Sequence, residues 1–178
     1  MAGHSKWKQI KEKKGKTDAK RSQVFAKYAK LISNEARAAK GNKDAPMLRA
    51  AIERARKENM PNENIERAIK KATEGGGAAL EAILYEAYGP GGVALLIEAL
   101  TDNRNRSAGE IKHLLAENGG NLASPGAAAW AFSKEPTTNH YQPTTTVPLE
   151  DADLEKLERL VEALEANEDV QEVITNAE

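Results

Sequence analysis

The sequence predicts an α+β protein made of two domains of opposite charge. The spacing of apolar residues changes from helical to strand-like near residue 80, and a glycine-rich stretch, "EGGGAA", lies just before this change. Residues 1–71 hold 20 Lys+Arg against 8 Asp+Glu, a net of +12, whereas residues 72–178 hold 6 against 19, a net of −13. We therefore predict a basic helical domain with an N-terminal arm (1–73), a linker (74–79) and an α+β domain (80–178).

Three amphipathic helices are predicted in the basic domain. Apolar residues at helical spacing indicate a first helix from Asp18 to Ala39, which "KGNKD" ends. A second helix is predicted from Pro46 to Glu58. A third follows Pro61, which suits a first helical turn, and extends to about Ala72.

A β-hairpin is predicted directly after the linker. Residues 82–88 and 92–100 have strand-like composition, and "GPGG" between them is typical of a hairpin turn. The second strand is apolar on both faces, which indicates a central strand covered on both sides. Ser107 and Glu110 match a capping box and predict a helix start, and "NGG" at 118–120 predicts its end.

The rest of the chain predicts two more strands, a helix and a final strand. The strands are expected at 127–132 and, with weaker patterning, at 141–149. The helix covers residues 151–166, and the closing strand covers 170–175. The order after the linker is ββαββαβ, which predicts an α+β sandwich with its helices on one sheet face.

Composition and motifs exclude several classes of protein. The chain has no cysteine, which excludes disulfides and thiolate metal sites. No apolar run approaches the roughly 18 residues of a membrane span, and no secretory signal is recognisable, so we expect a cytoplasmic protein without a membrane partner. Its three histidines are scattered, and catalytic, nucleotide-binding and metal-binding motifs are absent. We therefore expect no enzymatic activity, no cofactor, no metal and no small-molecule substrate.

The N-terminal arm, "MAGHSKWKQIKEKKGKTDAKR", is the first candidate site. Eight of its residues are Lys or Arg, and each can neutralise a phosphate and release counterions. The ring of Trp7 can stack on an unpaired base. The alternative is a solvated tail whose Trp7 and Ile10 pack onto the helical domain. We favour nucleic-acid binding, because basic arms commonly serve it, and we expect the free arm to be disordered.

The stretch "TDNRNRS" at 101–107 is the second candidate site. It lies between the predicted central strand and the next helix, so Arg104 and Arg106 are expected beside a helix N-terminus, which favours an anion. Arginine can bind phosphate through two parallel hydrogen bonds. Alternatively, Asp102 or a neighbouring carboxylate pairs with the arginines structurally. The sequence leaves these two interpretations equal.

Six stretches together extend over nearly the whole chain: "MAGHSKWKQIK", "DAKRSQVFAKYAKLI", "LRAAIERARKENMPNENIERAIKKA", "YEAYGPGGVALLIEALTDNRNRS", "GGNLASPGAAAWAF" and "DVQEVITNAE". These stretches resemble the YebC/PmpR family, which includes the mitochondrial translational activator of cytochrome c oxidase subunit I. The resemblance implies a basic three-helix N-terminal domain followed by α+β domains, in agreement with the patterns above.

The resemblance also implies a function in nucleic-acid binding. We favour a non-enzymatic translation factor that associates with ribosomal RNA and promotes elongation through stalling sequences such as proline runs. The alternative is a DNA-binding transcriptional regulator. Charge and resemblance together assign nucleic-acid contact to two segments. Their residues are His4, Ser5, Lys6, Trp7, Lys8, Lys11, Lys13, Lys14, Lys16, Lys20, Arg21, Asn103, Arg104, Asn105 and Arg106.

The chain departs from the family pattern in one place. Family members carry a third, acidic α/β domain after the strand that matches "AAAWAF". Here only "SKEPTTNH", residues 133–140, separates that strand from "YQPTTTV". Most of the third domain is therefore expected to be absent. Removal of an insertion at a loop leaves its host sheet intact, so the two remaining domains are expected to fold without it.

Overall fold

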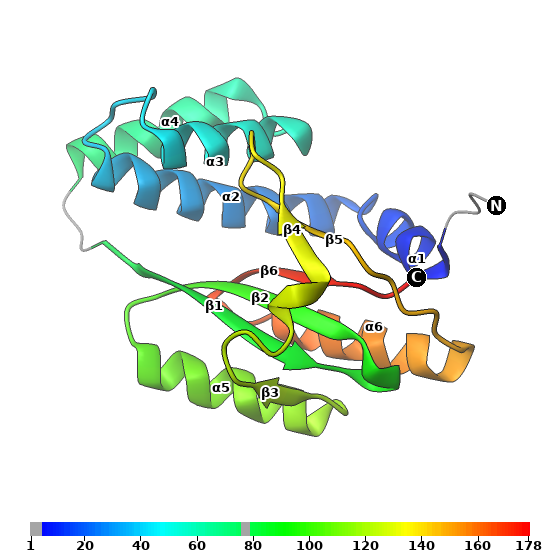
Figure 1. The fold of residues 1–178 in the computed structure, drawn as a ribbon. Helices are drawn as coiled ribbons and strands as arrows, with labels where there is room; N and C mark the ends of the chain where they lie inside the picture. The colour runs from blue at the N-terminus through cyan, green and yellow to red at the C-terminus, as the bar shows by residue number, and fades with distance from the viewer. Residues whose placement is uncertain (1–4, 76–78) are drawn as a thin grey trace. The chain divides into compact units, whose positions relative to one another are not determined.

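The structure is a computed structural model that describes residues 5–75 and 79–178 (Figure 1). Its contacts divide these residues into two compact units. The helical unit holds residues 14–75, 79–80 and 134–140, and the sheet unit holds residues 5–13, 81–133 and 141–178. Residues 5–13 of the N-terminal arm, which we expected in the helical domain, belong instead to the sheet unit. Residues 76–78 of the predicted linker lie outside the described residues.

The helical unit is built on three amphipathic helices, as predicted. They are α2 (Asp18–Ala38), α3 (Pro46–Lys57) and α4 (Asn62–Glu74). The hydroxyl of Thr17 caps α2 by accepting a hydrogen bond from the Lys20 backbone N–H at 3.2 Å. The apolar stripes of the helices meet in one core, whose fully buried members include Ile32, Leu48 and Ile65.

The sheet unit contains a four-stranded antiparallel sheet. Its strands are β1 (Glu81–Tyr88), β2 (Ala94–Thr101), β3 (Asn121–Ala123) and β6 (Val170–Thr175), in the order β3-β1-β2-β6. The predicted hairpin is confirmed, because β1 and β2 pair along their full lengths. β2 lies between β1 and β6, as its two apolar faces predict. The short edge strand β3 is an element that the sequence analysis missed.

Two glycines shape the hairpin turn. The turn is the single 3-10 turn η1 (Pro90–Gly92), in which Gly91 has φ of +71° and Gly92 has φ of +81°. Both values lie in the left-handed region that glycine adopts without steric cost. The Gly89 N–H donates to the Val93 carbonyl at 2.9 Å and closes the turn. "GPGG" therefore serves the hairpin.

Helices cover one face of the sheet. α5 (Arg104–Glu117) and α6 (Asp151–Glu165) lie on the same side of it in Figure 1, which confirms the predicted α+β arrangement. Alternate residues of the strands point towards these helices, as the two-residue period of a strand requires. The resulting core includes Leu95, Ile97, Val173, Ile111, Leu115, Leu157 and Leu160.

The opposite face carries an irregular segment instead of helices. It consists of the 3-10 turn η2 (Ala129–Ala131), β4 (Phe132–Lys134) and β5 (Tyr141–Pro143), and β4 pairs with β5 in a separate two-stranded sheet. Ala128, Ala131 and Phe132 pack there against Leu96 and Ile174. The strand predicted at 127–132 is therefore mostly a turn, and the strand predicted at 141–149 ends at Pro143. Small alanines pack closely over the sheet without needing strand pairing.

The start of α5 differs from the prediction. Ser107 does not cap this helix, because it lies buried inside it, one turn from the N-terminus. The cap is Asn103, whose side-chain oxygen accepts a hydrogen bond from the Arg106 N–H at 3.0 Å. Asparagine is among the best N-cap residues, so the helix starts four residues earlier than the capping-box pattern indicated.

The turn at residues 135–140 closes the β4–β5 hairpin. The Glu135 N–H donates to the His140 carbonyl at 2.8 Å, and the Glu135 carboxylate accepts from the N–H groups of Thr137 at 3.1 Å and Thr138 at 2.7 Å. The Thr138 hydroxyl also donates to it. These hydrogen bonds, with that of the hydroxyl foremost, lower the pKa of Glu135 from its ordinary 4.5 to about 2. The Glu135 carboxylate thus accepts hydrogen bonds from two backbone N–H groups and one hydroxyl of the turn.

Candidate nucleic-acid interface

The N-terminal arm forms a helix, α1 (Lys6–Lys14), and not the disordered segment that we predicted. The Ser5 hydroxyl accepts a hydrogen bond from the Lys8 N–H at 3.0 Å, and the Ser5 carbonyl accepts one from the Gln9 N–H at 3.1 Å. Serine therefore caps this helix in the usual way. His4, which the prediction included, lies outside the described residues.

Trp7 holds α1 onto the sheet unit. Its side chain is only 5% exposed and belongs to the core that includes Leu154 and Leu157 of α6, and Ile10 packs against the same core one turn later. Such burial leaves no free ring face for a base, so the base-stacking interpretation of Trp7 is wrong for this conformation. The alternative, that Trp7 and Ile10 pack onto the folded protein, is correct. They pack onto the sheet unit, however, and not onto the helical domain.

The lysines that follow Trp7 point to solvent. Among the described residues, no carboxylate pairs with the exposed side chains of Lys8, Lys11, Lys13 and Lys16. The charge of Lys6 is shared with Asp151 at the start of α6, at 3.0 Å. Both of these side chains are well exposed, so that pair is weak and readily exchanged. The buried Trp7 thus fixes a helix whose outer surface carries uncompensated positive charge.

The remaining basic residues of the arm have interaction partners within the protein. Lys14 and Lys20 are half-buried and have interaction partners, and Arg21 pairs with Asp18 on α2. Of the predicted arm residues, those best placed for a phosphate are therefore four lysines: Lys8, Lys11, Lys13 and Lys16.

The second predicted segment lies in the first turn of α5. Asn103 serves as the cap described above, and Asn105 is exposed. The Arg104 Nε donates to the Glu81 carboxylate of β1 at 3.1 Å. This hydrogen bond is the main cause of a lowered pKa at Glu81 and a raised pKa at Arg104. Arg104 therefore fastens the helix start to the neighbouring strand.

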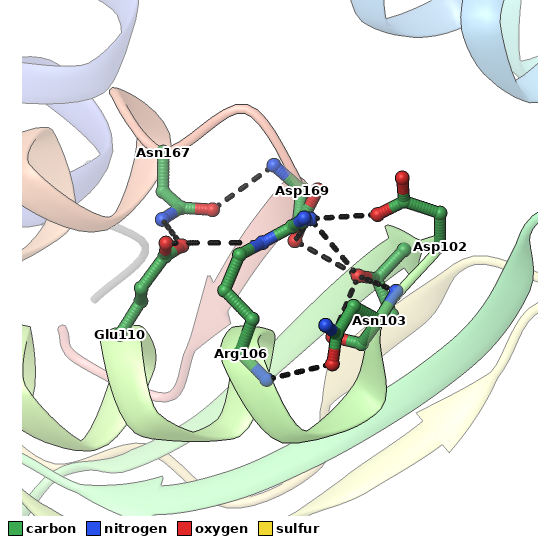
Figure 2. A network of polar contacts seen from close by, with 7 residues as sticks. Asp102, Asn103, Arg106, Glu110, Asn167 and Asp169 are labelled. Atoms are coloured by element: carbon green, nitrogen blue, oxygen red, sulfur yellow. Dashed lines mark hydrogen bonds and ion pairs between the residues drawn. The ribbon is translucent and has the colours of Figure 1, made fainter.

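Arg106 is the centre of a polar network (Figure 2). Its guanidinium donates to Asp169 at 2.9 Å and to Asp102 at 2.8 Å, and its Nε lies 3.8 Å from Glu110. Asp169 is buried and also accepts from the Thr101 hydroxyl at 2.9 Å. The carboxylates raise the pKa of Arg106, and the largest cause is the hydrogen bond that its guanidinium donates to Asp169. The network joins α5 to the segment that leads into β6.

The charge around these arginines favours their structural interpretation. Arg104 and Arg106 face four carboxylates, which belong to Glu81, Asp102, Glu110 and Asp169. The local charge is therefore negative, and a phosphate that approached would be repelled while competing with carboxylates already in place. Asp102 is the partner expected under the alternative interpretation. Asp169 could not be predicted, because a separation of 63 residues leaves no local signal.

Two classes of feature are not found in the described part of the chain. No helix there is both long and apolar enough to span a membrane. Within residues 5–75 and 79–178, His, Asp and Glu form no group of three that could hold a metal ion. The geometry thus defines a class of protein with one α-helical unit and one α+β unit. A buried tryptophan fixes a lysine-rich helix to the α+β unit.

Comparison with known families identifies the group within this class. The model described as "TACO1/YebC protein N-terminal domain" matches residues 5–75, and that described as "TACO1/YebC second and third domain" matches residues 80–139 and 135–177. The chain belongs to the TACO1/YebC family. The two segments matched by the second model meet at the turn described above, residues 135–139.

Individual relatives agree with this assignment. A protein of Halothermothrix orenii called "Probable transcriptional regulatory protein" is 49% identical over 173 residues, which are 96% of this chain and 66% of that protein. The chain thus spans just under two thirds of that relative's length. A protein of the same name from Pelotomaculum thermopropionicum is 40% identical over 240 aligned residues, 100% of this chain and 99% of that protein. This chain has 178 residues, so 62 of those 240 aligned positions have no counterpart in it, which fits the expected loss of most of the third domain.

A solved structure supports the fold. The crystal structure of a conserved hypothetical protein from Aquifex aeolicus matches with a TM-score of 0.70 and 31% sequence identity. The match covers 90% of this chain and 91% of the Aquifex chain.

Proposed function

We propose that this protein is a non-enzymatic nucleic-acid-binding factor that contacts ribosomal RNA and promotes elongation through stalling sequences in the cytoplasm. The observation that carries the proposal is the outer surface of α1, where Lys8, Lys11 and Lys13 are exposed without carboxylate partners among the described residues. Each such lysine can neutralise one phosphate and release its counterion. The resemblance to a family that includes a mitochondrial translational activator directs the proposal to translation.

The side chains of α1 favour contact with the phosphate backbone of a nucleic acid over recognition of its bases. Sequence-specific readout of DNA relies most on arginine, asparagine and glutamine, whose planar groups bind base edges through two hydrogen bonds, although lysine can also contact guanine. The exposed charges of α1 are lysines, with one glutamate, Glu12. Lysine acts on phosphate as a point charge, and a phosphate contact carries no base information. Such a surface suits a folded RNA recognised through its backbone.

Anchoring adds to this argument. A disordered basic arm loses conformational entropy when it binds, and this cost reduces its affinity. Trp7 and Ile10 hold α1 in place before any partner arrives. The lysines are therefore preorganised, and the proposed contact needs no folding step.

The second candidate function is DNA-binding transcriptional regulation. The observation in its favour is the name of the relatives, "Probable transcriptional regulatory protein". Both candidate functions require binding to a nucleic acid, so the kind of nucleic acid that the protein prefers distinguishes them. The test is binding of the full chain to purified ribosomes, to a ribosomal RNA fragment and to duplex promoter DNA of the same length, at several salt concentrations.

We expect the protein to cosediment with ribosomes at moderate salt and to bind the RNA fragment more tightly than the duplex. Lys8→Ala/Lys11→Ala/Lys13→Ala should release it from both RNA targets. Lys112→Ala is the matched control, because Lys112 is exposed on α5 and, like these three, pairs with no carboxylate of the described residues. Failure to sediment with ribosomes, together with protection of a defined promoter, would favour the regulator instead.

A further inference from the structure

Trp130 is the most exposed large apolar side chain in the described part of the chain. It is 61% exposed, whereas Trp7 is buried. Exposing an indole to water forgoes roughly the hydrophobic free energy that its burial would supply. The function proposed above does not use Trp130. Its position in the segment between β3 and β4, on the sheet face opposite α5 and α6, calls for an explanation of its own.

The ring of Trp130 is held at its polar edge. Its Nε1 donates to the Ala127 carbonyl at 3.0 Å and to the Tyr88 hydroxyl at 3.1 Å. The Tyr88 hydroxyl in turn donates to the same carbonyl. Because the indole N–H is satisfied, the ring is fixed in orientation and presents its apolar surface to solvent. It also has no polar group in need of a partner there.

The loop beneath the ring is equally fixed. The carboxylate of Glu86, itself buried, accepts backbone hydrogen bonds from Gly126 at 2.6 Å, Ala128 at 3.0 Å and Ala129 at 2.6 Å. Burial alone would raise the pKa of Glu86, but these three N–H groups together lower it. A carboxylate that stays charged therefore clamps the loop on both sides of Ala127, to which Trp130 is bonded.

Few large apolar side chains are exposed besides Trp130: within the described residues they are Met47, Leu84 and Leu122, and the two leucines are only 37% exposed. The loop before Trp130, Ser124 to Ala127, is exposed and contains only small residues and proline. Interfaces for protein partners need a contiguous apolar area with several large side chains. A single fixed ring with an open surface instead matches one planar partner. Nucleic-acid bases are such partners, and an unpaired base stacks on tryptophan regardless of sequence.

We propose that Trp130 is a stacking platform for an unpaired base of single-stranded RNA. The inference rests on the proposed function, since the lysines of α1 supply the attraction that brings the RNA to the protein. It adds the kind of RNA element recognised: a loop, a bulge or an unpaired end, whose base is free to leave its own stack.

The test uses the full chain and a fluorescently labelled oligouridine 12-mer as the probe. Trp130→Ala should weaken binding about 5- to 150-fold, the range for loss of one stacked base. Trp130→Phe should retain most of the affinity. The dependence of affinity on salt should be the same for wild type and Trp130→Ala, because both proteins neutralise the same phosphates. Unchanged affinity of Trp130→Ala overturns the inference.

A second probe separates stacking from phosphate binding. A 12-mer of the same length whose central nucleotides lack bases keeps every phosphate. Wild type should bind it as weakly as Trp130→Ala binds the intact 12-mer, and Trp130→Ala should lose nothing further on this probe. An equal loss for both proteins would overturn the inference, because the bases would then act elsewhere.

The lysine variant distinguishes failure of the inference from failure of the proposed function. If Lys8→Ala/Lys11→Ala/Lys13→Ala abolishes binding while Trp130→Ala binds as wild type does, the function stands and the platform is wrong. If wild type binds neither the 12-mer nor ribosomes, both are wrong. Loss of ribosome cosedimentation in Trp130→Ala without loss of 12-mer affinity would show that Trp130 contacts a protein, which also overturns the platform.

Discussion

The two basic segments, α1 and the first turn of α5, differ in what lies opposite their charges. Lys8, Lys11 and Lys13 of α1 face solvent. Arg104 and Arg106 of α5 face carboxylates from three other parts of the sheet unit. Composition favours phosphate binding for the first segment and leaves it equal to structural pairing for the second. The comparison teaches that a basic cluster is available to a ligand only where the fold has not already neutralised it.

The largest effect is expected from the residue that makes this difference possible. Trp7→Ala should lower the free energy of unfolding of the sheet unit by about 3–5 kcal/mol, because it leaves a cavity in the core. Urea denaturation followed by circular dichroism measures this change. Trp130→Ala is the matched control and should cost no more than about 1 kcal/mol, since its ring is exposed. Equal losses for the two variants would mean that Trp7 does not hold α1.

The next effect concerns the lysines themselves. For single-stranded RNA, Lys8→Ala/Lys11→Ala/Lys13→Ala should flatten the slope of log affinity against log salt by about 2, or roughly 0.7 for each phosphate that the variant no longer neutralises. The melting temperature should stay unchanged, because these side chains make no ion pair within the described residues. Fluorescence anisotropy from low to moderate salt measures the slope. An unaltered slope would remove α1 from the interface.

A smaller effect, on thermal stability and not on RNA affinity, is expected from the arginines of α5. Arg106→Ala should lower the melting temperature without changing RNA affinity, because buried Asp169 loses its guanidinium partner. The decrease should be less than that of Trp7→Ala, since the Thr101 hydroxyl still donates to Asp169. Arg104→Ala should change the melting temperature less, because its partner Glu81 is exposed. A loss of affinity with full thermal stability would restore the phosphate-binding interpretation.

The smallest effect is local and depends on pH. The folded pKa of Glu135, about 2, lies below its ordinary value of 4.5, so its contribution to the turn is complete above about pH 4.5. The contribution should decline as the pH falls from about 4.5 to about 2. The amide resonances of Thr137 and Thr138, which donate to this carboxylate, should titrate with a midpoint near pH 2. In Glu135→Gln this transition should vanish, and a wild-type midpoint near 4.5 would contradict the assignment.

Much of the fold could be predicted because its signals are local. The apolar stripes of α2, α3, α4 and α6 repeat at helical spacing over three turns or more, and the two-faced apolar pattern of β2 marks a central strand. The hairpin turn is recognisable from glycines that adopt positive φ. In each case the deciding residues lie within one element or its immediate neighbours.

The errors occurred where the deciding contact is distant in sequence. Two apolar residues among lysines gave no sign that Trp7 would enter a core formed mainly by residues 87–177. Asp169 meets Arg106 across 63 residues, and Glu86 meets Ala129 across 43. The capping box at Ser107 failed for a different reason: Asn103 competes for the same helix start and wins as the better-placed cap. Such distant contacts determine whether a candidate binding residue is free to meet a ligand.

The turn at residues 135–140 is also a site where the fold can tolerate an inserted domain. The backbone N–H of Glu135 donates to the His140 carbonyl, so the ends of β4 and β5 are neighbours in space. A whole folded module whose own termini lie close together can be spliced between them while the hairpin keeps its pairing.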